Sequence, residues 1–165
     1  MREHEDLSNA IIVAPDVGRA KLAEKYTDIL GLPLVLIHKR RRGAEVEVAE
    51  VVGEVAGKTP IIIDDIIASG SIYQQADALV NSGANPAVIS ITHPVLIGDA
   101  LDRLDRPSIR KVVATNTVPV AAEKRLGGKV QVLSIAPLVA DAILRIHQHR
   151  SVSEVFTQQK LVFPV

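Results

Sequence analysis

Residues 60–72 read Pro60-Ile-Ile-Ile-Asp-Asp-Ile-Ile-Ala-Ser-Gly-Ser-Ile72. The apolar run at the start of this stretch predicts a buried strand, which we expect to end at two adjacent carboxylates, Asp64 and Asp65. A turn of small residues follows at positions 68–71, and a helical pattern begins at once. A strand, a short turn and a helix make up a βα unit, and repeated βα units build an open parallel sheet.

The same stretch indicates a binding site. Open α/β sheets bind ligands beyond the carboxyl ends of their strands. The carboxylates of Asp64 and Asp65 can accept hydrogen bonds from vicinal hydroxyls, and the N–H groups at the start of the next helix can face a phosphate. We therefore expect a pocket for a ribose phosphate. The plainer alternative is a solvated turn without a ligand, because Asp-Asp and Ser-Gly are also ordinary turn residues.

The bulk composition points to the same fold class. The chain has 165 residues, enough for one domain with a sizeable core. Its apolar residues are mostly Val, Ile, Leu and Ala, with two Phe, two Tyr and no Trp. A β-branched core poor in aromatic residues suits a parallel sheet buried on both faces by helices. We predict one α/β domain over residues 1–165, with three layers and a mainly parallel central sheet.

Charge and cysteine content exclude several classes. The formal net charge is zero, so no global field attracts nucleic acid or a membrane surface. The chain has no cysteine, which rules out disulfides, thiolate zinc sites and a cysteine nucleophile. No apolar run reaches transmembrane length and the first residues lack an apolar targeting core, so we expect a cytoplasmic protein.

Apolar runs and amphipathic stretches alternate along the chain. Strands are predicted near Ala10–Ala14, Leu34–His38, Thr59–Asp64, Ala87–Thr92, Lys111–Thr115 and Val130–Ser134. Helices are predicted at Val17–Leu30, Ser71–Ser82, Leu96–Leu104, Pro137–His147 and Val152–Phe156, with Gly31 and Gly83 as helix stops. The segment Lys39–Val52 fits neither pattern, and we predict a mobile loop that leads into an edge hairpin.

Three further features are candidates for chemistry. Asp16 follows the first predicted strand, where it could cap a helix or hold a hydrated Mg²⁺. The basic cluster His38-Lys-Arg-Arg-Arg42 is either a solvated turn or a set of cations that closes over a polyphosphate. A nucleic-acid site is disfavoured because aromatic stacking residues are scarce. His93 follows another predicted strand, where it is either a structural histidine or a contact to a nucleotide.

Several short blocks recur in the same order in a known family. They are Ile11–Gly18, Ile37–Arg41, Val52–Val55, Gly57–Lys58, Thr92–Leu96, Thr115–Thr117, Leu133–Pro137 and Val152–Phe156. On these blocks, nearly the whole chain resembles the C-terminal half of ribose-phosphate pyrophosphokinase (phosphoribosyl pyrophosphate synthetase). The resemblance implies a type I phosphoribosyltransferase-like fold. It also implies an enzyme that transfers diphosphate from MgATP to ribose 5-phosphate and yields phosphoribosyl pyrophosphate and AMP.

The resemblance carries roles over to individual positions of the pocket. Asp64 and Asp65 would bind the ribose hydroxyls. Ser69, Gly70 and Ser71 would belong to the loop that holds the 5-phosphate. Catalysis would then rest on alignment and charge neutralisation rather than on a covalent intermediate.

Further roles follow outside the pocket. Asp16 would correspond to the acid near the sugar-bound Mg²⁺, and Lys39 and Arg41 would match the basic residues of a catalytic flexible loop. ATP and ribose 5-phosphate would be the substrates, with Mg²⁺ as cofactor and a homo-oligomer as the full-length assembly. No nucleic-acid or membrane partner is expected.

The chain departs from the family pattern at several positions. Ala68 stands where the phosphate loop usually has an acid, Ile72 replaces a hydroxyl residue, and His38 replaces a frequent Asp. Family members have two related domains, and only the second is represented here. We therefore expect this chain alone to keep a ribose-phosphate site and to lose most kinase activity.

Two other functions stay open at this stage. A standalone nucleobase phosphoribosyltransferase would also grip ribose 5-phosphate, but it should carry a base-binding hood, and no insertion of that size is visible. A noncatalytic subunit of a synthetase is compatible with Ala68 and with the missing half. The retained Lys39, Arg41, Asp64 and Asp65 argue against decay of the site.

Overall fold

A sheet dominates the first part of the chain and a pair of helices the second. The computed structural model describes residues 7–42, 45–120 and 126–157, and of these it describes only the backbone at 39–42, 45–49, 156 and 157. The chain divides into two compact units, Met1–Val132 and Leu133–Val165, and each is described by itself. In the ranges given above, no helix is both long enough and apolar enough to cross a membrane.

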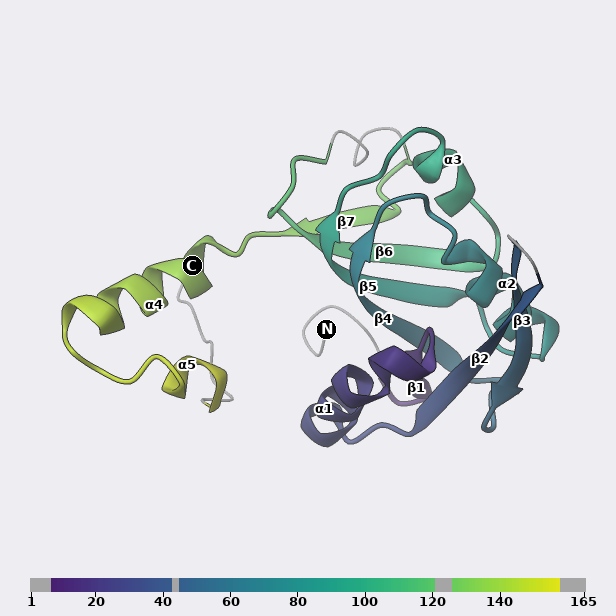
Figure 1. Cartoon of the computed structure of the whole chain (residues 1–165), viewed down its shortest axis with the longest axis horizontal. Coiled ribbons are helices and arrows are strands. Elements are labelled where there is room, and N and C mark those ends of the chain that lie inside the picture. Colours follow the sequence, from purple (N-terminus) through teal and green to yellow (C-terminus); the bar gives the residue numbers. More distant parts are fainter. Residues whose placement is uncertain (1–6, 43–44, 121–125, 158–165) are drawn as a thin grey trace. The chain divides into compact units, whose positions relative to one another are not determined.

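The first unit is built on a seven-stranded sheet in the order β3-β2-β1-β4-β5-β6-β7 (Figure 1). The strands are β1 (Ala10–Ala14), β2 (Leu34–Arg42), β3 (Glu45–Val52), β4 (Thr59–Ile67), β5 (Ala87–Pro94), β6 (Ile109–Thr115) and β7 (Val130–Leu133). Strands β2, β1, β4, β5 and β6 pair in parallel, and β3 pairs antiparallel with β2 at one edge. The predicted mainly parallel sheet with an edge hairpin is confirmed.

Helical segments connect the strands. They are η1 (Val17–Arg19), α1 (Ala20–Leu30), α2 (Tyr73–Asn81) and α3 (Ala100–Leu104), and the second unit holds α4 (Ala136–His147) and α5 (Glu154–Thr157). Gly31 ends α1 with φ 71°, and Gly83 follows α2 with φ 91°. After α2, Gly83 N–H donates to Val80 O (2.9 Å) and Ala84 N–H to Leu79 O (3.0 Å), the Schellman pattern. Both predicted helix stops are confirmed.

The sheet is buried on both faces, as the residue alternation along each strand requires. One face carries Ile11, Ile62 and Ile89, which share a core cluster with Leu79 of α2. The neighbouring residues on each strand point to the opposite face and are equally buried, for example Ile61 at 1% exposure. Helix α1 connects β1 to β2 and helix α2 connects β4 to β5, so the two connections run toward opposite edges of the sheet. Because crossovers between parallel strands are right-handed, the two helices cover opposite faces.

Several predicted boundaries were wrong, and three of the differences have a clear structural cause. Strand β4 continues beyond Asp64 to Ile67, because its pairing with β5 persists through the Ile67–Pro94 register pair. The backbone of 39–42 is strand rather than loop, since β2 pairs with β3 to its end. Helix α3 begins at Ala100 rather than Leu96, because the Leu96 and Ile97 amides bond to carbonyls at the end of β4.

Candidate functional site

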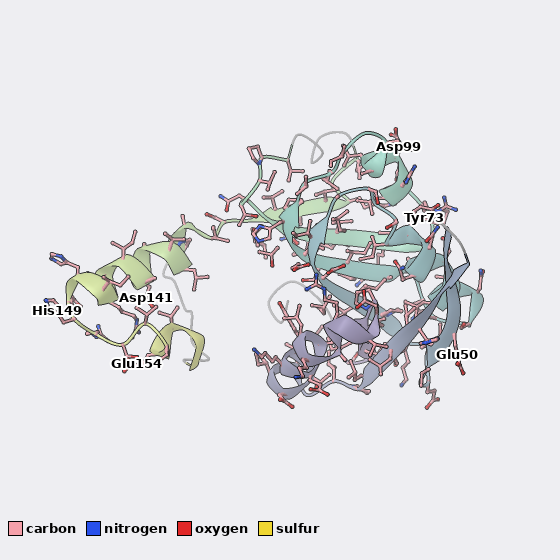
Figure 2. The ribbon with its side chains drawn as sticks, in the orientation of Figure 1. Glu50, Tyr73, Asp99, Asp141, His149 and Glu154 are labelled. Atoms are coloured by element: carbon pink, nitrogen blue, oxygen red, sulfur yellow. The ribbon has the colours of Figure 1, made fainter. Side chains whose placement is uncertain are left out.

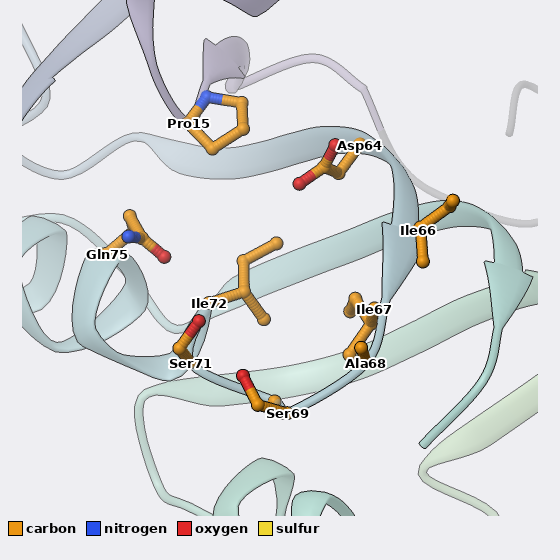
Figure 3. Close-up of a pocket in the computed structure, with 10 residues that line it drawn as sticks. Pro15, Asp64, Ile66, Ile67, Ala68, Ser69, Ser71, Ile72 and Gln75 are labelled. Carbon is orange, nitrogen blue, oxygen red and sulfur yellow. The ribbon is translucent and has the colours of Figure 1, made fainter. Parts of the chain in front are cut away.

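A small pocket lies at the carboxyl end of β4, where the chain turns into α2. Its volume is about 230 Å³. Ten residues line it: Pro15, Asp64, Ile66, Ile67, Ala68, Ser69, Gly70, Ser71, Ile72 and Gln75. Figure 3 shows the Asp64 carboxylate and the hydroxyls of Ser69 and Ser71 pointing into the same hollow from opposite sides. Four of the five residues predicted for the ribose-phosphate pocket, Asp64, Ser69, Gly70 and Ser71, therefore line one hollow.

The loop side of the pocket presents amides rather than carbonyls. The Gly70 carbonyl accepts from Tyr73 N–H (3.2 Å) and the Ser71 carbonyl from Gln74 N–H (3.1 Å). In the described part of the chain, the amides of Ser69, Gly70 and Ser71 donate to no protein acceptor. They lie just before α2, whose N-terminus adds a partial positive charge. This arrangement suits an anion, and no lysine or arginine whose side chain the structure describes lines the pocket to bind one instead.

The acidic side of the pocket is held by one arginine. The Arg19 guanidinium pairs with Asp64 through Nε (Nε–Oδ1 3.1 Å) and with Asp65 through a second nitrogen. The Arg19 backbone N–H donates to Asp16 Oδ1 (3.1 Å), which caps η1. All three acids expected at the site are therefore linked through Arg19, which the sequence pattern did not identify.

The two neighbouring carboxyls are shifted in opposite directions. Burial raises the pKa of Asp64, and the hydrogen bond from the Asp65 N–H (2.8 Å) and the charge of Arg19 only partly offset it. For Asp65, burial also acts to raise the pKa, but the hydrogen bond with Asp64 and the charge of Arg19 outweigh it and lower the pKa. The pair therefore takes up its first proton on Asp64, as expected for adjacent acids in unequal surroundings.

Asp65 and Asp16 lie beside the pocket rather than in its lining. Among the described residues, no three His, Asp or Glu side chains gather in a way that could hold a metal ion. A divalent cation at this edge would therefore take most of its ligands from water and from a bound substrate. Mg²⁺ tolerates this arrangement, since it usually keeps several water ligands.

His93 belongs to a separate polar network at the end of β5. Its Nδ1 lies 3.0 Å from Thr117 Oγ1, and Thr117 Oγ1 donates to Thr92 O (2.9 Å). The His93 ring is therefore held in place by Thr117, which itself contacts the carbonyl of Thr92. His93 does not line the pocket.

One predicted pair of site residues is not described, and one pocket residue was not predicted. The side chains of Lys39 and Arg41 lie outside the described residues. Gln75, on the first turn of α2, lines the pocket although it is 2% exposed, and the sequence pattern did not single it out. Its place three residues after Ile72 on a helix that starts at the loop was the available signal.

Comparison with known proteins gives a consistent picture. A family model described as "Phosphoribosyl synthetase-associated domain" matches residues 45–157. A ribose-phosphate pyrophosphokinase from Halalkalibacterium halodurans is 44% identical over 156 residues, which cover 93% of this chain and 49% of the relative. The Bacillus subtilis ribose-phosphate pyrophosphokinase is 41% identical and matches 94% of this chain and 49% of its own length.

Comparison with solved structures gives a similar result. The phosphoribosylpyrophosphate synthetase from Mycobacterium smegmatis aligns with a TM-score of 0.77 and 39% identity, over 89% of this chain and 48% of that one. The chain thus spans about half the length of the relatives it matches.

Proposed function

Because this chain belongs to the phosphoribosyl synthetase-associated domain family, we propose that its pocket is the ribose 5-phosphate site of a ribose-phosphate pyrophosphokinase. The single observation that carries this proposal is the geometry of the pocket, where a carboxylate faces a loop of available amides across about 230 Å³. That volume falls below the roughly 300–1,000 Å³ of drug-sized sites, so it favours a small ligand.

The two sides of the pocket match the two ends of a sugar phosphate. Asp64 and Asp65 can accept hydrogen bonds from the ribose hydroxyls, and Arg19 cancels one of their two negative charges. The amides of Ser69 and Gly70 can donate to the phosphate oxygens. Partial cancellation matters because the ligand is itself an anion, which two uncompensated carboxylates would repel.

The proposed reaction is in-line diphosphoryl transfer. The anomeric hydroxyl oxygen attacks the β-phosphorus of ATP, the bond from that phosphorus to the α-phosphate bridging oxygen breaks, AMP leaves, and the hydroxyl proton passes to solvent. This chain would fix the sugar so that the anomeric oxygen points away from the phosphate loop. Orienting a reactant in this way lowers the entropic part of the barrier.

Charge neutralisation would come from several further groups. Mg²⁺, when bound, would neutralise phosphoryl oxygens, with Asp16 as one protein-side contact through water. Lys39 and Arg41, at the edge hairpin, are proposed to act on the transferred diphosphate. His93, at the end of β5, is proposed as a contact to the nucleotide. For the whole protein we expect a homo-oligomer, which light scattering would test.

Calorimetry with ribose 5-phosphate and Mg²⁺ tests the site. We expect binding by the parent chain and a loss of at least about tenfold for Asp64→Asn with Asp65→Asn, since each charged acceptor contributes about 1.5–3 kcal/mol. Asp105→Asn is the matched control. Asp105 is an ion-paired surface acid, held by Lys129 at 3.0 Å, and it lies outside the pocket lining.

Two results would contradict the proposal. One is equal binding by the double variant and the control, and the other is no binding by the parent chain. The transfer itself is tested on the whole protein by following AMP formation from MgATP and ribose 5-phosphate with ³¹P NMR. Release of pyrophosphate that depends on an added nucleobase would instead favour a phosphoribosyltransferase.

A further inference from the structure

Successive carbonyls at the end of β4 are bonded to one neighbouring segment. The Ile67 carbonyl accepts from Leu96 N–H (3.0 Å), and the Ala68 carbonyl accepts from Ile97 N–H (2.8 Å). The next carbonyl, of Ser69, accepts from a side chain, the Arg103 guanidinium (3.3 Å). Three consecutive peptide groups therefore point their oxygens toward residues 96–103, which form the turn before α3 and most of α3 itself.

The orientation of these peptides fixes the orientation of the amides. In a planar trans peptide the C=O and the following N–H point in opposite directions. Because the Ala68 and Ser69 carbonyls point toward the 96–103 segment, the amides of Ser69 and Gly70 point away from it. Both residues line the pocket, and neither amide has a protein acceptor in the described part of the chain.

Arg103 is itself held in place. Its Nε donates to Asp99 Oδ2 (3.0 Å), one turn earlier at the start of α3, where Figure 2 labels Asp99. Gly70 also packs closely on α3, since a Cβ at Gly70 would lie 2.8 Å from Ala100 O. Arg103 does not line the pocket, so its charge acts from behind the loop rather than as a direct ligand.

We propose that Arg103, oriented by Asp99, is a positioning residue that turns the Ser69–Gly70 peptide so that the Gly70 N–H faces the bound phosphate. This inference rests on the proposed function, because it assumes an anion at the loop. It assigns to α3 a part in substrate binding without contact to the substrate. Neither Asp99 nor Arg103 was a candidate from the sequence.

Amide NMR with inorganic phosphate as the probe tests this role. In the parent chain, phosphate should shift the ¹H–¹⁵N signals of Ser69, Gly70 and Ser71. In Arg103→Gln, phosphate affinity should fall roughly three- to tenfold, the size expected for one ordinary hydrogen bond, because Arg103 acts on the peptide group and not on the phosphate itself. The shift of Gly70 at saturation should also shrink. Arg103→Lys should restore part of the phosphate affinity and part of the Gly70 shift. Asp99→Asn should lower the phosphate affinity by less than Arg103→Gln does.

Lys129→Gln is the matched control. Lys129 also joins a carboxylate, Asp105 (3.0 Å), to a backbone carbonyl, that of Arg106 (3.0 Å), but outside the pocket. Titrations at about 0.15 M and 0.5 M salt separate positioning from long-range charge, which salt screens. The loss in Arg103→Gln should persist at the higher salt.

The outcomes separate this inference from the function on which it rests. If phosphate fails to shift the loop amides of the parent chain, the proposed phosphate site is wrong. If the parent responds but Arg103→Gln responds equally, only the positioning role is overturned. The positioning role is also overturned if Lys129→Gln loses as much phosphate affinity as Arg103→Gln. It is overturned as well if the Gly70 shift at saturation is unchanged in Arg103→Gln, or if the affinity loss in Arg103→Gln disappears at 0.5 M salt.

Discussion

Arg19 gives the acidic side of the pocket its character. Two adjacent carboxylates repel each other, and a single guanidinium bridges them here, so the three side chains together carry one net negative charge. The two carboxyls lie in unequal surroundings. The side chain of Asp64 is 21% exposed and that of Asp65 39%, and their pKa values move in opposite directions. A test at this scale should therefore separate the two neighbours.

We predict opposite effects of Asp64→Asn and Asp65→Asn on thermal stability at pH 7.5. The raised pKa of Asp64 means that the folded chain prefers the protonated form, so its ionisation costs stability as pH rises above about 3.9, the unfolded value. Asparagine avoids that cost, so Asp64→Asn should raise Tm at this pH.

At Asp65, ionisation has the opposite effect on stability. Its lowered pKa means that ionisation stabilises the fold above about pH 3.9, and that this contribution is lost as pH falls through the lower folded value. Asp65→Asn should lower Tm at pH 7.5. Both differences should shrink toward pH 3, as followed by circular dichroism melts. Shifts of the same sign for the two variants at pH 7.5 would overturn the assignment of the pKa directions.

At the scale of elements, the turn between β4 and α2 depends on a glycine. Gly70 has φ 73°, a left-handed conformation that costs other residues about 1 kcal/mol or more. Gly31, at the end of α1, has nearly the same φ of 71°. The two differ in their surroundings: a Cβ at Gly31 would meet nothing within 4 Å, whereas one at Gly70 would lie 2.8 Å from Ala100 O.

This pair supports a matched prediction. Gly31→Ala should cost about 1 kcal/mol from the backbone conformation alone. Gly70→Ala should cost roughly 1–3 kcal/mol more, since backbone atoms of α3 must move, and it should also abolish phosphate binding. Urea unfolding measures the first effect and the phosphate titration the second. Equal costs for both variants would mean that the contact between Gly70 and Ala100 is not tight in solution.

The sequence predicted the elements better than their limits. Period and composition placed β1, β2, β4, β5, β6 and β7, and Gly31 and Gly83 marked the ends of α1 and α2. Strand β3 was predicted only as part of an edge hairpin, because its alternation is weak. The end of β4 was missed because two acids looked like a terminus, whereas pairing with β5 carries the strand on to Ile67. The start of α3 was missed because long-range bonds from the Leu96 and Ile97 amides to the end of β4 replace the first helical turn.

The residues of the site also divide into those that the sequence could predict and those that it could not. Asp64 and the loop residues Ser69, Gly70 and Ser71 were predictable, because adjacent residues at the end of one strand reach one pocket whatever the rest of the fold does. Arg19 and Arg103 were not predictable. Each lies more than thirty residues along the chain from the loop or acid that it contacts, and only the sheet order brings them there.

At the scale of the whole chain, the second unit has an organising centre of its own. Arg145 of α4 is 5% exposed, its Nε bonds to Asp141 (3.0 Å), and another of its nitrogens bonds to Glu154 of α5 (2.7 Å). The same nitrogen donates to Ser151 O (3.2 Å). Figure 2 labels both acids. One buried side chain therefore joins α4, the connecting turn and α5.

We predict that Arg145→Ala releases α5 from α4. Removing the guanidinium takes away the partner that Asp141 and Glu154 share, together with the donor to Ser151 O. Amide exchange at Val155, which is 4% exposed and donates to Val152 O (3.1 Å), should then accelerate by at least about tenfold.

Arg150→Ala is the control for this change, since Arg150 lies in the same turn but its side chain makes one long hydrogen bond within the described part of the chain, to Gln148 (3.5 Å). It should leave Val155 exchange unaltered. If Arg145→Ala also leaves it unaltered, apolar packing around Val155 rather than the arginine holds α5. If both variants accelerate exchange equally, the effect comes from general loosening of the turn. Only the selective effect of Arg145 fits a unit held together through one buried charge.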